Sequence, residues 1–202
     1  MTIRGDLPAK LQKLLPDTLL SVAQYLRLRR GEHLFQQDSA PRRMFYVLNG
    51  EVALERSGEN GERIILQRAR NGFLAEASLL AARYHCDAIV TRDGSAIGLP
   101  LEIMRGALQD DAGFAMRWVA MLNAEIRVLR LRCERLSLKG VEARLMHLIE
   151  SEGEGGHYII ESTLKSLALE LGVSHEALYR ELSRMARSGK ILRHERELIA
   201  LR

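Results

Sequence analysis

The stretch TLKSLALELGVSHEALYRELSRMARSG, from Thr163 to Gly189, decides the fold class, because it predicts two helices joined by a tight turn. Apolar residues recur at steps of three and four in the first helix, and Gly172 then ends that helix in a left-handed conformation. Ser174 is expected to cap the second helix by accepting from its free N–H groups. The small side chain of Ala168 lets the two helices cross closely.

The second helix is expected to turn a polar face outward near its amino end, with the size and chemistry of a major-groove reader. Arg180 can offer two parallel donors to guanine, Glu176 can accept from cytosine N4, and His175 can donate to a phosphate or a base edge. An ordinary helical hairpin with solvated charges is the alternative. The predicted reader face comprises His175, Glu176, Tyr179, Arg180 and Ser183.

The segment ILRHERELIALR, from Ile191 to Arg202, predicts two short apolar strands around a polar turn at 194–197. A helix pair followed by such a hairpin is a winged-helix arrangement, which is a more specific pattern than either half. Residues 141–150 are expected to begin this DNA-binding domain. SEGEGG, at 151–156, is interpreted as a flexible turn on the surface.

Residues 111–139 predict one long helix, because the segment lacks Pro, has no Gly after Gly113 and is rich in good helix formers. Its apolar residues follow alternating steps of three and four, which is typical of a two-stranded coiled coil and predicts a homodimer. The alternative is that this stripe packs on the chain's own barrel. The predicted dimer stripe comprises Val119, Leu122, Ile126, Leu129, Cys133 and Leu136.

From Arg30 to about Leu101, short apolar runs parted by Gly, Asn and Asp predict a succession of strands, including the run GFLAEASLL, and hence a small β-barrel or roll. SGENGE, at 57–62, predicts a hairpin tip. Gly50 and Gly72 predict further bends.

Residues 7–28 have helical apolar spacing broken by Pro16, and they predict one or two short helices. The predicted fold class is therefore α+β. It combines an N-terminal β-roll of the double-stranded β-helix or jelly-roll type over 1–110, a long dimerisation helix over 111–138 and a C-terminal winged helix-turn-helix over 139–202.

The composition suits a globular DNA-binding protein, since 47% of the 202 residues are hydrophobic and the net charge is +4. No apolar run approaches the roughly 20 residues that span a bilayer, and residues 1–10 do not form a signal peptide, so we expect a cytoplasmic protein without membrane contact. Cys86 and Cys133 form no CxxC pair, which argues against a disulfide framework or a conventional zinc site. We find no catalytic motif and expect no enzyme.

The succession of roll, long helix and winged helix resembles the CRP/FNR family of bacterial transcription regulators. The resemblance is carried by GEHLFQQDSAPRRMFYVLNGEVAL, GFLAEASLL, LSLKGVEARL and LALELGVSHEALYRELSRMARSGKI. It implies a homodimer that binds a palindromic site in double-stranded DNA, contacts or blocks RNA polymerase, and responds to an effector in a cyclic-nucleotide-binding-like roll.

The resemblance also implies roles for single residues of the reader. Ser174, Glu176 and Arg180 match the family's recognition helix, whereas His175 departs from it. Contacts to phosphate or flanking DNA are implied for Thr163 and His194.

The effector site implied by the resemblance departs from cyclic-AMP binders. Glu76 matches the glutamate that accepts from the ribose hydroxyl, but Ala75 replaces the preceding Gly, and the Arg-Ser pair has become His85-Cys86. Without that fixed guanidinium, bidentate phosphate recognition is lost, so we predict that cyclic AMP is not the ligand. The effector candidates are Glu76, His85, Cys86, Leu129 and Arg130, the last two standing where the family has an adenine-facing Thr-Ser pair.

The nature of the effector stays open. No cysteine precedes Cys86, so the chain does not match members that hold an iron–sulfur cluster. His85 and Cys86 are ligand types for haem or a metal, and a thiol can respond to oxidants. Alternatively Cys86 is a buried apolar residue and His85 a pocket wall, because neighbours in a strand face apart. Cys133 is either filler in the dimer stripe or half of an intersubunit disulfide.

A second hypothesis for the function differs in class. It makes the chain a ligand-sensing or redox-sensing module whose winged helix contacts a protein partner instead of DNA.

Overall fold

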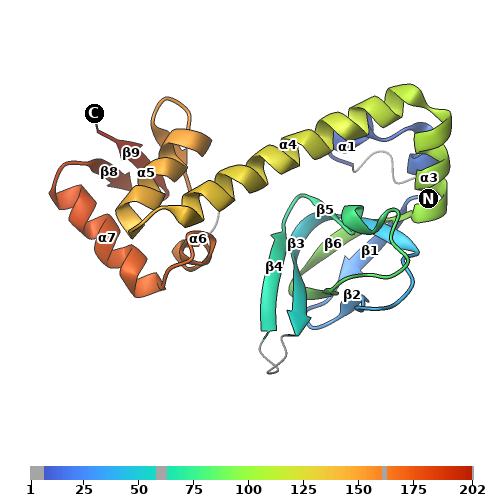
Figure 1. Ribbon diagram of the computed structural model, residues 1–202, viewed down its shortest axis with the longest axis horizontal. Helices are drawn as coiled ribbons and strands as arrows, with labels where there is room; N and C mark the ends of the chain where they lie inside the picture. The colour runs from blue at the N-terminus through green and yellow to red at the C-terminus, as the bar shows by residue number, and fades with distance from the viewer. Residues whose placement is uncertain (1–6, 58–62, 161–162, 202) are drawn as a thin grey trace. The chain divides into compact units, whose positions relative to one another are not determined.

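The computed structural model describes residues 7–57, 63–160 and 163–201, and the chain divides into two compact units, Met1–Ala120 and Met121–Arg202. The first unit carries the roll, and the second carries a cluster of helices with a small sheet (Figure 1). Gly58, Asn60 and Gly61 of the predicted hairpin tip lie outside the described residues. None of the helices in the described ranges combines the length and apolar character needed to span a bilayer.

Two short helices open the first unit, α1 (Ala9–Leu14) and α2 (Asp17–Val22), and Pro16 separates them as predicted. The helical prediction is wrong beyond α2, because residues 24–28 form strand β1 (Gln24–Leu28). Leu26 and Leu28 of YLRL are two residues apart, so they also fit the alternation of a strand. Antiparallel pairing with β6 favours the strand over the helix.

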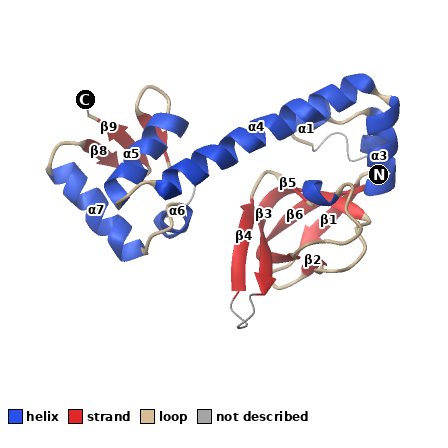
Figure 2. Cartoon of the chain, viewed as in Figure 1, coloured by secondary structure: helices blue, strands red, loops and turns tan. Residues whose placement is uncertain are grey.

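The roll is one antiparallel sheet with the order β1-β6-β3-β4, in which β2 adds to β6 and β5 adds to β3 (Figure 2). Its long strands β3 and β6 pair from Arg43↔Pro100 to Glu55↔Asp87, with register shifts near Gly50. The two backbones approach so closely here that a Cβ on Gly94 would lie 2.2 Å from the carbonyl oxygen of Asn49. The strands are β2 (His33–Phe35), β3 (Arg43–Ser57), β4 (Arg63–Ala69), β5 (Phe73–Leu74) and β6 (Asp87–Pro100).

The run GFLAEASLL is a strand only over β5, which corrects the sequence prediction. Ala75 follows with a φ of 69°, in the left-handed region, and the chain then forms the 3-10 turn η2 (Glu76–Ser78). The left-handed residue ends the strand, so the remainder of the run forms the edge of the predicted effector region.

Two helices follow the roll, where the sequence predicts one. α3 (Leu101–Asp110) was missed, whereas α4 (Ala112–Ser137) matches the predicted long helix. Asp111 separates them, and its Oδ1 accepts from the N–H of Phe114 at 2.8 Å. Within the first unit, the ring of Trp118 on α4 packs edge-on against Phe73 of the roll, with centroids 5.1 Å apart.

The second unit is a winged helix. Its sheet has the order β7-β9-β8. β8 and β9 are the two strands of the predicted wing, and β7, which the sequence analysis missed, pairs with β9. The helix α5 includes Ser151 and Glu152, so the predicted turn at 151–156 begins later, at Gly153. The elements are α5 (Val141–Glu152), β7 (His157–Ile159), α6 (Leu164–Glu170), α7 (His175–Arg187), β8 (Ile191–His194) and β9 (Glu197–Ala200).

Candidate nucleic-acid interface

Both helices of the helix-turn-helix begin at a side-chain cap. Thr163 Oγ1 accepts from the N–H of Ser166 at 3.2 Å, and Ser174 Oγ accepts from the N–H of Ala177 at 3.1 Å. Gly172 lies between the helices with a φ of 64°, and a Cβ there would lie 3.0 Å from Leu136. The caps and the tight turn therefore fix where α7 starts, as the sequence predicts.

Helix α7 is sharply divided between a buried and an exposed side. Leu178, Leu182 and Met185 are completely buried in the core of the second unit. The opposite side presents four of the five predicted reader residues to solvent, and the fifth, Ser183, is half-buried. The exposed four are His175, Glu176, Tyr179 and Arg180.

Glu176 is held in its ionised form. A hydrogen bond from its own backbone N–H, and then one from Ser174, lower the pKa of Glu176 from its ordinary value. An ionised carboxylate can only accept hydrogen bonds, so it is matched to donors such as cytosine N4.

The four exposed residues line a shallow hollow of about 430 Å³ on α7, whose surface is formed mainly by carbon atoms. Tyr179 contributes an aromatic ring, and the residue is 51% exposed. The guanidinium carbon of Arg193, on wing strand β8, lies 5.1 Å from the centre of this ring, and the ring of His175 lies 6.1 Å away on the preceding helical turn. Sequence reasoning missed Arg193, because only the folded wing brings it to α7.

Ion pairs hold α7 on α5. Glu142 of α5 bonds to both Arg184 of α7 and Lys190 after it, and Arg184 also bonds to Glu181. Hydrogen bonds from Lys190, then from Arg184, lower the pKa of Glu142. Arg184 and Lys190 are exposed and the two glutamates are half-buried, so each pair contributes little alone, but together the pairs join α7 to α5.

Arg144 of α5 fixes the turn between α6 and α7. Its Nη1 donates to the carbonyl of Leu171 at 2.8 Å, and its Nε donates to the carbonyl of Leu138 at 3.0 Å. The ends of α4 and α6 are thus bonded to the same guanidinium.

The effector candidates in the roll do not form a metal-binding site. Cys86 is buried and His85 is exposed, so their side chains lie apart as expected, although both precede β6 in a bend and not within a strand. Burial, then the charge of Asp87, raise the pKa of the Cys86 thiol. No group of three metal-ligating side chains occurs in the part of the chain that the structure describes. Glu76 is half-buried at the start of η2.

A buried charge network lies elsewhere in the roll, and sequence reasoning missed it. Glu51 on β3 is 7% exposed and accepts from Thr91 Oγ1 at 2.6 Å and from Arg68 Nη1 at 2.7 Å. Arg70 bonds to its second oxygen. Burial alone would raise the pKa of Glu51, but the bonds from Thr91, Arg70 and Arg68 outweigh it and lower the pKa. Separate segments of the roll supply these groups, so no local pattern reveals them.

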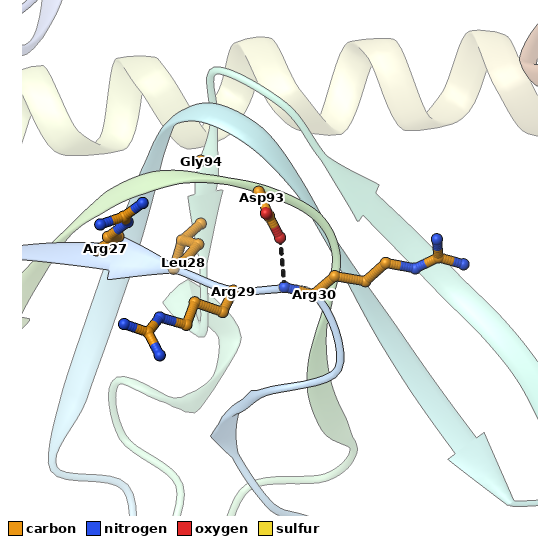
Figure 3. A pocket seen from close by; sticks show the side chains of 6 residues that line it. All are labelled: Arg27, Leu28, Arg29, Arg30, Asp93 and Gly94. Carbon is orange, nitrogen blue, oxygen red and sulfur yellow. Dashed lines mark hydrogen bonds between the residues drawn. The ribbon is translucent and has the colours of Figure 1, made fainter.

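Three arginines border a shallow depression of about 690 Å³ at the end of β1. Arg30 donates its backbone N–H to Asp93 Oδ1 at 2.7 Å, while the guanidinium groups of Arg27, Arg29 and Arg30 point in different directions (Figure 3). They form an exposed basic surface and do not converge on one small anion.

The apolar stripe of α4 is largely exposed within this single chain. Val119, Ile126, Leu129 and Leu136 are each between 44% and 54% exposed. Leu122 is half-buried, and Cys133, Leu129 and Arg130 are exposed. Within the first unit, α4 packs on the roll through buried Phe114 and Trp118, which lie outside the predicted stripe.

The described elements define a class of protein in which a β-roll is followed by a long helix and a winged helix-turn-helix. Comparison with protein families matches residues 25–111 to the cyclic nucleotide-binding domain. Comparison with curated proteins finds no match.

Solved structures share the fold along most of the chain. FixK2 from Bradyrhizobium japonicum has a TM-score of 0.64 at 19% identity, covering 90% of this chain and 93% of that one. The c-di-GMP responsive global regulator CLP from Xanthomonas campestris has a TM-score of 0.58 at 16% identity, covering 92% and 97%. A CRP-family transcriptional regulator from Thermus thermophilus has a TM-score of 0.55 at 16% identity, covering 88% and 92%. Residues 25–111 therefore match the cyclic nucleotide-binding domain, and the chain shares its fold with these three solved structures.

Proposed function

We propose that this chain is a sequence-specific DNA-binding transcription regulator. The observation that carries the proposal is the exposed polar face of α7, with Glu176 and Arg180 beside a three-stranded wing and a completely buried opposite side. A helix of this kind can enter the major groove with its amino-terminal residues against base edges. Arg180 then reads guanine, Glu176 reads cytosine, and His175 contacts a phosphate or a base edge.

Contacts to the DNA backbone fix the reader in register. Thr163 caps the start of α6, Ser174 caps the start of α7, and His194 ends wing strand β8. Such contacts carry position and little sequence information. Ser183 belongs instead to the reader face of α7, with the residues proposed to contact base edges.

The active form is a homodimer joined along α4. The apolar stripe from Val119 to Leu136 is exposed in one chain, and its spacing fits the facing positions of a two-stranded coiled coil. Two readers related by a two-fold axis then bind an inverted repeat whose half-sites are about one helical turn apart. RNA polymerase is the expected protein partner at the promoter.

The effector differs from cyclic AMP. Ala75 has the left-handed backbone that glycine adopts most readily, but exposed His85 and buried Cys86 stand where cyclic-AMP binders need an arginine and a serine. The raised pKa of Cys86 keeps it a thiol at neutral pH, which disfavours a fast-reacting redox switch at this residue. A small effector that contacts Glu76, His85 or the Leu129-Arg130 step of α4 fits these side chains better than a metal or haem.

Selection of bound sequences from random duplex DNA tests this function, with protein purified both in air and anaerobically. Recovery of an inverted repeat supports the dimeric regulator. Enrichment only from anaerobic protein would make Cys86 and Cys133 the redox candidates. If neither sample enriches a motif, a winged helix that serves a protein partner becomes the better account.

A further inference from the structure

The reader surface contains an aromatic side chain, Tyr179, whose ring makes no conventional hydrogen bond to base edges. Tyr179 follows Glu176 by almost one helical turn and precedes Arg180, so it lies on the same side of α7 as two groups that can bond base edges. The residue is half-exposed, whereas tyrosine usually buries most of its surface. The hollow beside it is walled mainly by carbon. This surface is suited to an apolar group of the DNA.

The ring of Tyr179 is held in place from two sides. Arg193 of the wing places its guanidinium carbon 5.1 Å from the ring centre, within the range of a cation–π contact. His175 lies four residues earlier on the same helical face, with its ring 6.1 Å away. Arg193 is itself half-buried, so the stack is partly shielded from water. A braced ring can contact a ligand without first losing side-chain freedom.

The major groove offers one apolar group among its base edges, the C5-methyl of thymine. Adenine, guanine and cytosine present donors and acceptors but no methyl group there, and an aromatic ring makes no conventional hydrogen bond to them. We propose that Tyr179 reads a thymine methyl group in each half-site, and that Arg193 is a positioning residue that holds the ring against it. This inference rests on the proposed DNA-reading function, and it adds one base pair to those read by Glu176 and Arg180.

Replacing thymine by uracil removes only the methyl group and tests the proposal at single positions. Wild-type protein is titrated against the selected duplex and against a set in which each thymine of one half-site is uracil in turn. One uracil position is expected to weaken binding by about fourfold, the equivalent of one buried methyl group. Equal binding to all uracil duplexes would overturn the proposal while leaving the regulator intact.

Four variants assign the effect to its side chains. Tyr179→Ala is expected to bind the thymine and uracil duplexes equally, and Tyr179→Phe is expected to keep the wild-type ratio. Loss of the ratio in Tyr179→Phe would mean that the hydroxyl group reads the base, which contradicts methyl readout.

The third variant, Arg193→Ala, is expected to reduce the thymine-to-uracil ratio, and its conservative counterpart Arg193→Lys to restore part of it. If Arg193 served only as a phosphate contact, its loss would weaken both duplexes equally and leave the ratio unchanged, which would overturn the positioning role. Failure to select any DNA site would overturn the proposed function as well, so the two failures are distinct.

Discussion

Arg135 on α4 is completely buried, and its guanidinium forms an ion pair with Glu152 at the end of α5. Glu170 of α6 lies 3.8 Å from the same guanidinium, and Ser151 accepts from it at 3.3 Å. One side chain therefore joins the end of the long helix to two helices of the winged domain. Because the second unit starts at Met121, this clamp lies wholly within it.

Glu152→Gln should destabilise the winged helix by about 3 kcal/mol, because it leaves a buried guanidinium without its main counter-charge. Arg135→Met should cost less, since it fills a similar volume and leaves no buried charge. Unfolding followed by far-UV circular dichroism measures both. The single tryptophan, Trp118, belongs to the first unit, and its fluorescence transition should stay unchanged. Equal losses in the two variants would contradict the ion-pair account.

The Glu51 network should make the roll sensitive to acid. The pKa of Glu51 is lower in the folded chain than its ordinary value of 4.5. Its stabilising effect is therefore fully present above about pH 4.5 and is lost as the pH falls through the folded pKa. Glu51→Gln should lower the unfolding free energy at pH 7 by about 2 to 4 kcal/mol and flatten this acid dependence. Trp118 fluorescence during denaturation at several pH values measures the unfolding free energy of both proteins. If this free energy depended on acid pH in Glu51→Gln as it does in the wild type, the role of the network would be refuted.

Leu129→Asp should convert the dimer into a monomer, because it places a charge in the middle of the apolar stripe of α4. Val128→Asp is the matched control, since Val128 is also exposed on α4 but lies outside the stripe. Sedimentation velocity at micromolar concentration distinguishes the two. Dissociation by both variants, or by neither, would show that the stripe does not form the dimer contact.

Cyclic AMP should give no saturable heat in titration calorimetry with the full chain. Ala75→Gly and His85→Arg with Cys86→Ser restore the family's residues around Glu76, and this triple variant should gain affinity. Tight binding by the wild-type chain would mean that other residues replace the missing guanidinium.

Much of the fold could be predicted because its patterns are local. The caps at Thr163 and Ser174, the turn at Gly172 and the absence of helix breakers in α4 after Gly113 each depend on neighbouring residues. The failures have tertiary causes. β1 was predicted as helix because only pairing with β6 selects its strand conformation. β7 was missed because three residues have too little pattern of their own.

The candidate site divides in the same way. The exposed face of α7 follows from helical periodicity, so His175, Glu176, Tyr179 and Arg180 could be named from the sequence. Arg193 could not, because its contact with Tyr179 depends on how the wing folds back on the reader. Glu51 and Arg135 were missed for the same reason, since each gathers partners from distant elements.

The most direct measurement compares wild-type protein with Arg180→Ala on the selected duplex and on unrelated DNA, with Arg29→Ala in the roll as a control for the lost charge. The account predicts that Arg180→Ala loses about 1–3 kcal/mol on the selected duplex, relaxes preference at one base pair and binds unrelated DNA almost as wild type does. Arg29→Ala should match wild type on both. Uniform weakening of Arg180→Ala on all DNA would contradict base reading by α7.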